Sequence, residues 1–175
     1  MDIATPGIPI FRNRFHLPAP ERWIPRVIGI VPFYLQHYGD FTRIFTDGDK
    51  GFYVGESTLW AYKRLASFHN LDLDSLRRSY IRCLKKSLNV PLPISSRNLV
   101  LFGVKVREAK NHNDGAVAYI ADPYVQHIQS LGKRKSRITL TTGDTIETLM
   151  SKQNVEARKM QAGLLHLYLR DRGSL

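Results

Sequence analysis

Three short segments in the first third of the chain are rich in β-branched and aromatic residues. They are VIGIVPFYL (27–35), TRIFT (42–46) and GFYVG (51–55). Such composition and length favour strands, and DGDKG (47–51) contains the Asp-Gly dipeptide typical of a tight hairpin turn. Strands with connections this short pair as antiparallel neighbours. The sequence therefore predicts an antiparallel meander that the rest of the chain must cover.

Beyond residue 56 the apolar pattern changes to helical spacing. Helices are predicted over 57–68 and 72–88, with Ser57 or Thr58 able to cap the first and Asp72 or Asp74 the second. One face of the second helix is apolar, with Leu73, Leu76, Tyr80, Cys83 and Leu84. The opposite face is basic, with Arg78, Arg82, Lys85 and Lys86. The apolar face is expected to pack against the sheet and the basic face to meet solvent.

The second half of the chain contains further strand signals and ends in a helix. The prolines of NVPLPISS (89–96) end the helix, and strands follow at 98–106 and 115–121 around a polar turn, AKNHND (109–114). In SRITLT (136–141) and TIETL (145–149) polar and apolar residues alternate on the two sides of Gly143-Asp144. This pattern predicts a hairpin. A final helix over 153–170 is expected to be apolar along Ala157, Met160, Leu164 and Leu167 or Tyr168.

These elements predict an α+β fold, an antiparallel sheet of meander and hairpins covered by two central helices and a C-terminal helix. Its 175 residues suit a single domain at 26–175, preceded by an extended arm over 1–25 because proline is dense there. The longest apolar run, 27–35, is too short for a membrane span. A lone Cys83 and the lack of a secretory signal pattern favour the cytoplasm.

Charge is the first indication of function. The chain has 26 Lys and Arg against 15 Asp and Glu, a formal net charge of +11 with a pI near 10.0. Such an excess attracts polyanions, and nucleic acid is the leading partner. The same positive charge would also attract an anionic membrane surface or an acidic protein.

Clusters of basic residues narrow this choice. KRKSR places Lys133, Arg134, Lys135 and Arg137 on a loop and the start of a hairpin strand. Clustered cations displace counterions from a phosphate backbone, although a solvated loop has the same composition. The last helix adds a third basic surface, with Lys152, Lys159, His166 and Arg170 near one side. Three basic surfaces on one small domain favour nucleic acid.

A helix-turn-helix is a further possibility within residues 65–80. Leu65-Ala66, Asn70 in the usual glycine position, Leu71 and Leu76 resemble that pattern, which would turn Asp74, Ser75, Arg77 and Arg78 toward a major groove. Two amphipathic helices packed side by side give the same spacing. Binding of RNA or single strands would instead need exposed aromatic residues for stacking. The candidates are Phe52, Tyr53, Tyr119 and Tyr124, all of which also suit a core.

Catalysis finds little support. Ser57, Ser95 and Ser96 lack a nucleophile-elbow frame, and no glycine-rich turn offers a phosphate cradle. The six histidines are scattered without metal-ligand spacing. We expect a protein that is not an enzyme and uses no cofactor or metal.

Several segments together resemble the ComK family of bacterial competence transcription factors. PLPISSRNLVLF (91–102), VAYIADPYVQHI (117–128) and SRITLTTGDTIETLMSKQNVEARKMQAGLL (136–165) are similar, in order, to the C-terminal half of that family. FYVGESTLWAYKR (52–64) resembles its aromatic, glycine and serine segment that closes with a basic residue, here Lys63-Arg64. The resemblance spans roughly residues 27–169.

The resemblance implies a sequence-specific activator that binds paired A·T-rich boxes of double-stranded DNA as a homo-oligomer, largely through the minor groove. It also implies an adaptor protein for proteolysis as a partner. The expected DNA contacts are Arg64, Arg78, Arg82, Lys85, Lys133, Arg134, Lys135 and Arg137. The alternatives are a basic module that docks an acidic protein partner and a binder of RNA or single strands.

Overall fold

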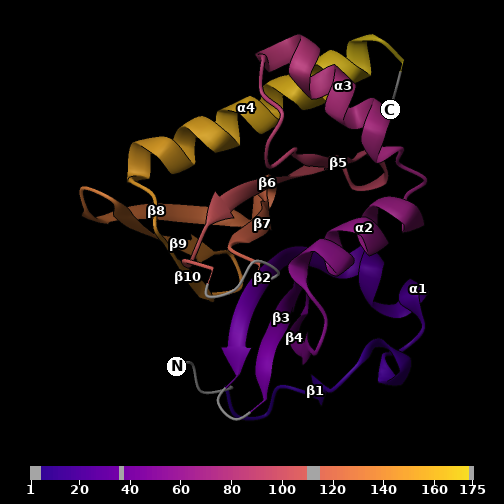
Figure 1. The fold of residues 1–175 in the computed structure, drawn as a ribbon, viewed down its shortest axis with the longest axis vertical. Coiled ribbons are helices and arrows are strands. Elements are labelled where there is room, and N and C mark those ends of the chain that lie inside the picture. Colours follow the sequence, from indigo (N-terminus) through magenta and orange to yellow (C-terminus); the bar gives the residue numbers. More distant parts are fainter. Residues whose placement is uncertain (1–4, 36–37, 110–114, 174–175) are drawn as a thin grey trace.

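The computed structural model describes residues 5–35, 38–109 and 115–173. Within these residues the chain forms a seven-stranded sheet in the order β1-β4-β3-β2-β7-β6-β5 and a three-stranded sheet in the order β10-β9-β8. The α-helices lie on and above these sheets (Figure 1). The predicted α+β class, with a C-terminal helix packed on antiparallel sheet, is confirmed.

The predicted meander forms the centre of the large sheet. Strands β2 (Val27–Leu35), β3 (Gly39–Thr46) and β4 (Asp49–Val54) pair antiparallel in sequence order. The turn between β3 and β4 contains Gly48, whose φ of +84° favours glycine. Apolar side chains of the meander are almost entirely buried, which explains why these segments are near-continuous apolar runs.

The buried side chain of Arg43 stabilises the β3–β4 hairpin through hydrogen bonds to its backbone. The pairing slips by one residue between Ile44 and Thr46, and the Arg43 guanidinium donates to the carbonyl oxygens of Ile44 (2.8 Å) and Phe52 (3.3 Å). The guanidinium also lies against the ring of Phe45, 4.6 Å from its centroid. Burial lowers the pKa of Arg43. An irregular stretch of sheet therefore has its free carbonyls satisfied by one buried side chain.

The second half of the chain extends the same sheet. Strands β5 (Leu92–Ile94), β6 (Leu99–Lys105) and β7 (Val117–Ala121) pair antiparallel, and β7 joins the meander where Gly29 lies opposite Ile120. The short helix η3 (Ser95–Arg97) connects β5 to β6. Apart from Ala109, the polar turn predicted at 109–114 lies outside the described residues.

The N-terminal segment differs from the expected extended arm. Strand β1 (Ile10–Phe11) pairs parallel with β4, and the chain continues through η1 (Arg14–His16), α1 (Pro20–Trp23) and η2 (Ile24–Arg26). Proline lies in the first two positions of two of these short helices, Pro20 at the start of α1 and Pro25 second in η2, since its fixed φ suits the beginning of a helix. Trp23 and Ile24 are buried in the main core, so the described part of this segment is packed on the domain.

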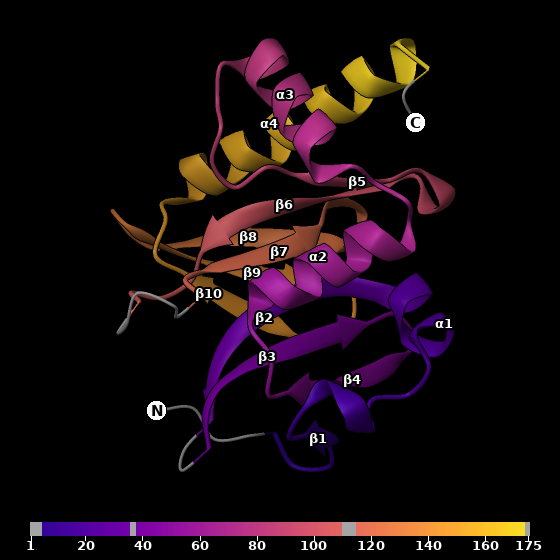
Figure 2. The same cartoon turned by 45° about the vertical axis from the view of Figure 1, so that its right-hand side comes forward.

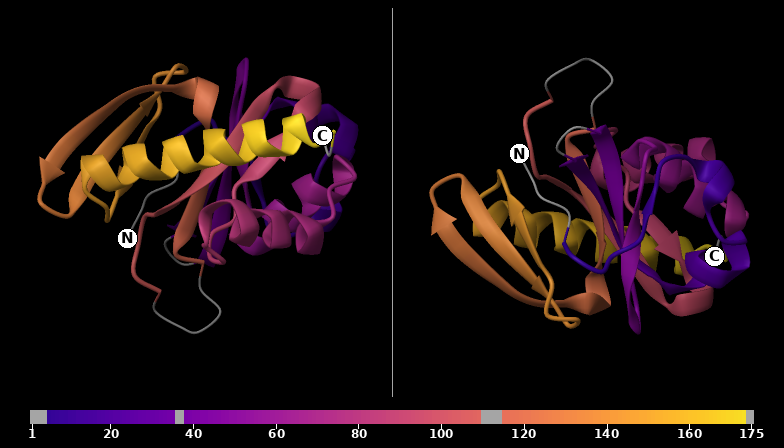
Figure 3. Two further views of the ribbon diagram at one scale, coloured as in Figure 1. Left: turned by 90° about the horizontal axis from the view of Figure 1, so that it is seen from above. Right: turned by 90° about the horizontal axis from the view of Figure 1, so that it is seen from below.

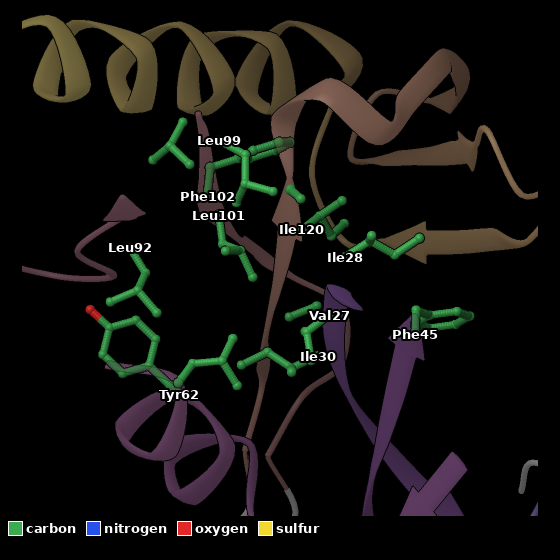
Figure 4. Close-up of a cluster of buried hydrophobic side chains, with 14 of the residues drawn as sticks. Val27, Ile28, Ile30, Phe45, Tyr62, Leu92, Leu99, Leu101, Phe102 and Ile120 are labelled. Carbon is green, nitrogen blue, oxygen red and sulfur yellow. The ribbon is translucent and has the colours of Figure 1, made fainter. Parts of the chain in front are cut away.

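The long helices cover the sheets from different sides. Helix α2 (Thr58–Phe68) packs on β2, β3 and β7, whereas α4 (Lys152–Asp171) packs on β5, β6, β8 and β9 (Figure 2). Helix α3 (Leu73–Leu84) packs against α4. The close-up shows the buried cluster of Leu92, Leu99, Leu101, Phe102 and Ile120 between α4 and the Tyr62 of α2 (Figure 4). The side chains of Ser57, Asp72 and Ser151 cap the three helices.

The buried face of α4 was predicted wrongly. The buried residues are Val155, Ala162, Leu165 and Leu169. Three residues of the predicted apolar side are exposed, Met160 by 64%, Leu164 by 47% and Leu167 by 52%. Apolar residues occur around most of this helix, so their spacing alone does not show which side meets the sheet.

The small sheet contains the predicted C-terminal hairpin. Strands β9 (Lys135–Leu140) and β10 (Thr145–Thr148) pair around the Gly143-Asp144 turn, as expected. A third strand, β8 (Val125–Gly132), pairs with the other edge of β9 and follows β7 through η4 (Asp122–Tyr124). Sequence did not indicate β8 as a separate strand because only Ile128 among its residues is buried.

Candidate nucleic-acid interface

Strands β8 and β9 form a two-stranded ribbon that projects from the body of the molecule. Its tip reaches beyond the N-terminal end of α4 in both views of Figure 3. Gly132 pairs with Lys135, which leaves Lys133 and Arg134 as the two turn residues. Strand β10 pairs with β9 only from Ser136 to Thr139, so the part beyond Ser136 is the ribbon alone.

The base of the ribbon is well anchored. Ile138 and Leu140 of β9 and Ile146 of β10 are buried, and α4 packs on β8 and β9. Between the strands, the buried hydroxyls of Ser136 and Thr148 lie 2.8 Å apart in a hydrogen bond. Since every second residue of β9 faces this core, the ribbon has one fixed register.

Unpaired cations lie at the tip. Lys133, Arg134 and Lys135 are exposed, and no described carboxylate is within ion-pair distance of any of them. A tight two-residue turn favours Asn and Gly. Gly132, with a φ of +138°, supplies the unusual backbone conformation, and the turn itself requires no cation. The positive charge is therefore free to attract an anion.

Arg137 is more constrained than its three neighbours. It lies opposite Glu147 in the β9–β10 pairing, and its guanidinium is 2.6 Å from that carboxylate. This cross-strand pair offsets its charge. Strand β8 carries further exposed polar groups, Gln126, His127, Gln129 and Ser130. The ribbon thus combines a cationic tip with a polar edge.

The basic stripe on α3 was predicted correctly as an exposed face. Leu76 and Tyr80 are buried, whereas Arg78, Arg82 and Lys85 are exposed. Arg78 has a local role, because its guanidinium donates to the Ser75 hydroxyl (2.7 Å) in the first turn of the helix. Lys85 ends the helix in the left-handed conformation, with φ +55°.

The helix-turn-helix pattern is correct for the turn but not for the packing. Asn70 adopts φ +54°, as expected for a residue in place of glycine. In a DNA-binding helix-turn-helix the two helices pack against one another. Here α2 rests on the large sheet and α3 packs against α4, so their principal packing partners differ.

Arg64 lies apart from both of these surfaces. It is exposed on α2, beside a cavity formed with the N-terminal segment, and in Figure 1 α2 and the ribbon lie on opposite sides of the molecule. The eight predicted contacts therefore form three groups, on the ribbon, on α3 and on α2. The structure brings Lys133, Arg134, Lys135 and Arg137 together and separates them from the rest.

The basic surface expected on the last helix is partly neutralised. Lys159 is 3.0 Å from Asp122, and Lys152 is 3.8 Å from Glu156. Burial, followed by the charge of a neighbouring arginine, lowers the pKa of His166 and disfavours its cationic form. This side of α4 is a weaker phosphate site than the ribbon tip.

Of the aromatic residues considered for base stacking, two lie in the core and two, Tyr119 and Tyr124, are partly buried against it. Phe52 and Tyr53 are buried, and burial raises the pKa of Tyr119 to about 12. Tyr124 donates its hydroxyl proton to Asp47 at 2.7 Å. Sequence reasoning instead missed Phe15, an aromatic residue that is 81% exposed. The two arginines that precede it in RNRFH (12–16), Arg12 and Arg14, were the available signal.

Comparisons with known proteins returned no match to a family model, a curated protein or a solved structure. Membership of the ComK family and an adaptor partner therefore stay predictions. Among the described residues, no three His, Cys, Asp or Glu side chains are grouped as a metal ion would require. No helix in the same part of the chain is long and apolar enough to cross a membrane.

Proposed function

We propose that this protein is a DNA-binding transcriptional regulator that inserts the β8–β9 ribbon into a groove of the duplex. The observation that supports this most is the unpaired cationic tip on a projecting, anchored ribbon. Lys133 and Lys135 contact phosphates on either side of the groove, and Arg134 at the turn enters it. The ribbon has the shape that DNA-binding strands present to a groove.

The proposed target is an A·T-rich minor groove. A·T-rich tracts narrow this groove and strengthen its negative potential, which attracts arginine in particular. The guanidinium of Arg134 has no described carboxylate partner to compete with the groove. A net charge of +11 adds long-range attraction to any duplex. Phosphates supply most of the affinity and groove shape most of the discrimination.

Competition among an A·T-rich duplex, a G·C-rich duplex and a single strand tests this proposal. The A·T-rich duplex should compete best. Arg134→Lys keeps the charge but removes the guanidinium, so the A·T preference should fall several-fold while the salt dependence is unchanged. Arg82→Lys on α3 is the matched control and should leave the preference intact.

Two results would contradict the proposal. Equal competition by all three probes would show attraction without recognition of groove shape. Tight binding of an acidic protein, with only weak and sequence-blind retention of DNA at physiological salt, would instead assign the tip to a protein partner.

Association of two copies is part of the proposal and rests on the exposed stripe of α4. Met160, Leu164 and Leu167 lie on one side of the helix, next to Gly163, where an added Cβ would have no neighbour within 4 Å among the described residues outside its own turn of the helix. Glycine inside a helix is about 1 kcal/mol less favourable than alanine, but it lets a second helix approach closely.

An antiparallel pair of α4 helices centred on Gly163 places Glu156 of one copy beside Arg170 of the other. This charge match favours a second copy over an unrelated partner. Leu164→Glu should shift sedimentation toward the monomer, whereas Leu88→Glu, at a residue 71% exposed elsewhere, should not. Sedimentation of the unaltered protein as a monomer at all concentrations would contradict the pairing.

A further inference from the structure

A second candidate site lies at the opposite end of the molecule from the ribbon. The N-terminal segment and α2 line an open cavity of about 420 Å³, within the size range of small-molecule sites. Its lining includes three aromatic rings, Phe15, Trp23 and Trp60, and two guanidinium groups, Arg14 and Arg64. Proline and aliphatic side chains complete the walls.

Local hydrogen bonds hold Phe15 at the edge of this cavity. The Asn13 side chain caps η1 by accepting the Phe15 backbone N–H at 3.1 Å, and Glu56 accepts the Arg14 backbone N–H at 3.3 Å. The Arg14 guanidinium lies 5.2 Å from the centroid of the Phe15 ring. With 81% of its surface exposed, Phe15 gains little from burial within the chain. A ring held outward at a cavity is available for stacking on a ligand.

The charges at this cavity are also unsatisfied. No described carboxylate is within ion-pair distance of the Arg14 or Arg64 guanidinium. A neighbouring cavity on the other side of Trp23 differs in this respect, because its Arg26 is already 2.8 Å from Asp49. The cavity of Phe15 thus combines aromatic walls with arginines available to an anion.

We propose that this cavity binds a nucleotide. The base stacks against Phe15 and Trp60, and the phosphate lies between Arg14 and Arg64, since guanidinium groups bind phosphate through paired hydrogen bonds. The same chemistry is offered by a free nucleotide and by an unstacked nucleotide within a strand. This inference does not depend on the ribbon or on regulation of transcription.

Intrinsic fluorescence provides a direct assay. The chain has two tryptophans, and both Trp23 and Trp60 line the cavity. Titration with adenosine monophosphate should quench this emission saturably. Adenosine, which lacks the phosphate, should bind about tenfold or more weakly, because hydrogen bonds to charged groups are lost. Inorganic phosphate should not quench, since it has no ring to stack.

Matched variants separate the two halves of the site. Arg64→Ala should weaken the nucleotide about tenfold or more and leave adenosine nearly unchanged. Lys63→Ala removes the same charge from the adjacent exposed residue, outside the cavity lining, and should have little effect. Phe15→Ala should weaken both ligands. Simultaneous replacement of Lys133, Arg134 and Lys135 by alanine should leave quenching intact, which separates this proposal from DNA binding by the ribbon.

A short adenine oligonucleotide distinguishes the two sources of the nucleotide. If it binds more tightly than adenosine monophosphate and remains sensitive to Arg64→Ala, the site takes a nucleotide within a strand; if it binds no better, the site takes a free nucleotide. Failure of millimolar adenosine monophosphate and of the oligonucleotide to quench would overturn the proposal. So would saturable binding of an uncharged proline-rich peptide in their place, or an equal effect of Lys63→Ala and Arg64→Ala.

Discussion

The ribbon tip allows a quantitative prediction from its three unpaired cations. Replacing Lys133, Arg134 and Lys135 together by alanine removes the two proposed phosphate contacts and the Arg134 cation proposed to lie in the groove between them, and each of these three cations neutralises about one phosphate charge. Each neutralised phosphate contributes about 0.9 to the slope of log affinity against log salt, so the slope should flatten by about 2.7. Between about 50 and 200 mM salt the wild-type affinity should therefore fall about 40-fold more than that of the variant.

The assay is fluorescence anisotropy of a labelled A·T-rich duplex at several salt concentrations. The matched control replaces Arg78, Arg82 and Lys85 by alanine, because this lowers the formal net charge of +11 by the same three units at another surface. The control should keep nearly the full slope. An unchanged slope in the ribbon variant would refute contact by the tip, and equal flattening in both variants would show that only overall charge matters.

Three further outcomes test the packing around these sites. Leu165→Ala should lower the free energy of unfolding in urea by about 2–5 kcal/mol because Leu165 is fully buried, whereas Leu88→Ala, at an exposed residue, should change it by no more than about 0.5 kcal/mol. Gly51→Ala should lower the free energy of unfolding, measured by thermal denaturation, by about 1–2 kcal/mol or more. The φ of Gly51 is +61°, and an added Cβ would lie 2.0 Å from the Ile44 carbonyl oxygen. Burial, with a smaller contribution from a nearby arginine, lowers the pKa of His69, so the unfolded chain takes up its proton first and stability should fall as pH drops below about 6.5. His69→Gln should reduce this loss of stability at low pH, which urea unfolding at several pH values would measure. An equal loss in the wild type and the variant would show that His69 is not the group responsible.

Local sequence signals were sufficient to group the cations of the ribbon tip, although the ribbon itself was not predicted because β8 was not indicated. The alternation around Gly143-Asp144 predicted the last hairpin, and the cations of KRKSR are adjacent in sequence, so no tertiary information was needed to group them. The same is true of the α3 stripe, where helical spacing alone separates Tyr80 from Arg82. The β3–β4 hairpin was predictable because its turn is short and consists of Asp47 and Gly48.

Features that depend on long-range packing were not predictable. Helix α4 has apolar residues on more than one side, and only contact with the sheet distinguishes the buried Leu165 from the exposed Leu164. The prolines near the N-terminus suggested an unpacked arm, although Trp23 is buried against Phe52 of β4. The cavity proposed to bind a nucleotide joins Phe15 and Trp60, which are far apart in sequence and are brought together by the fold.

The parallel pairing of β1 with β4 has a practical consequence for anyone who shortens this chain. A version that starts at Val27 would lack β1 and would therefore leave the edge of β4 unpaired. It would also expose the ring of Phe52, against which Phe11 and Trp23 pack. Unpaired edge strands form hydrogen bonds with strands of neighbouring molecules and so promote aggregation. Such a truncated protein should precipitate during purification, and its loss of activity would then say nothing about nucleic acid.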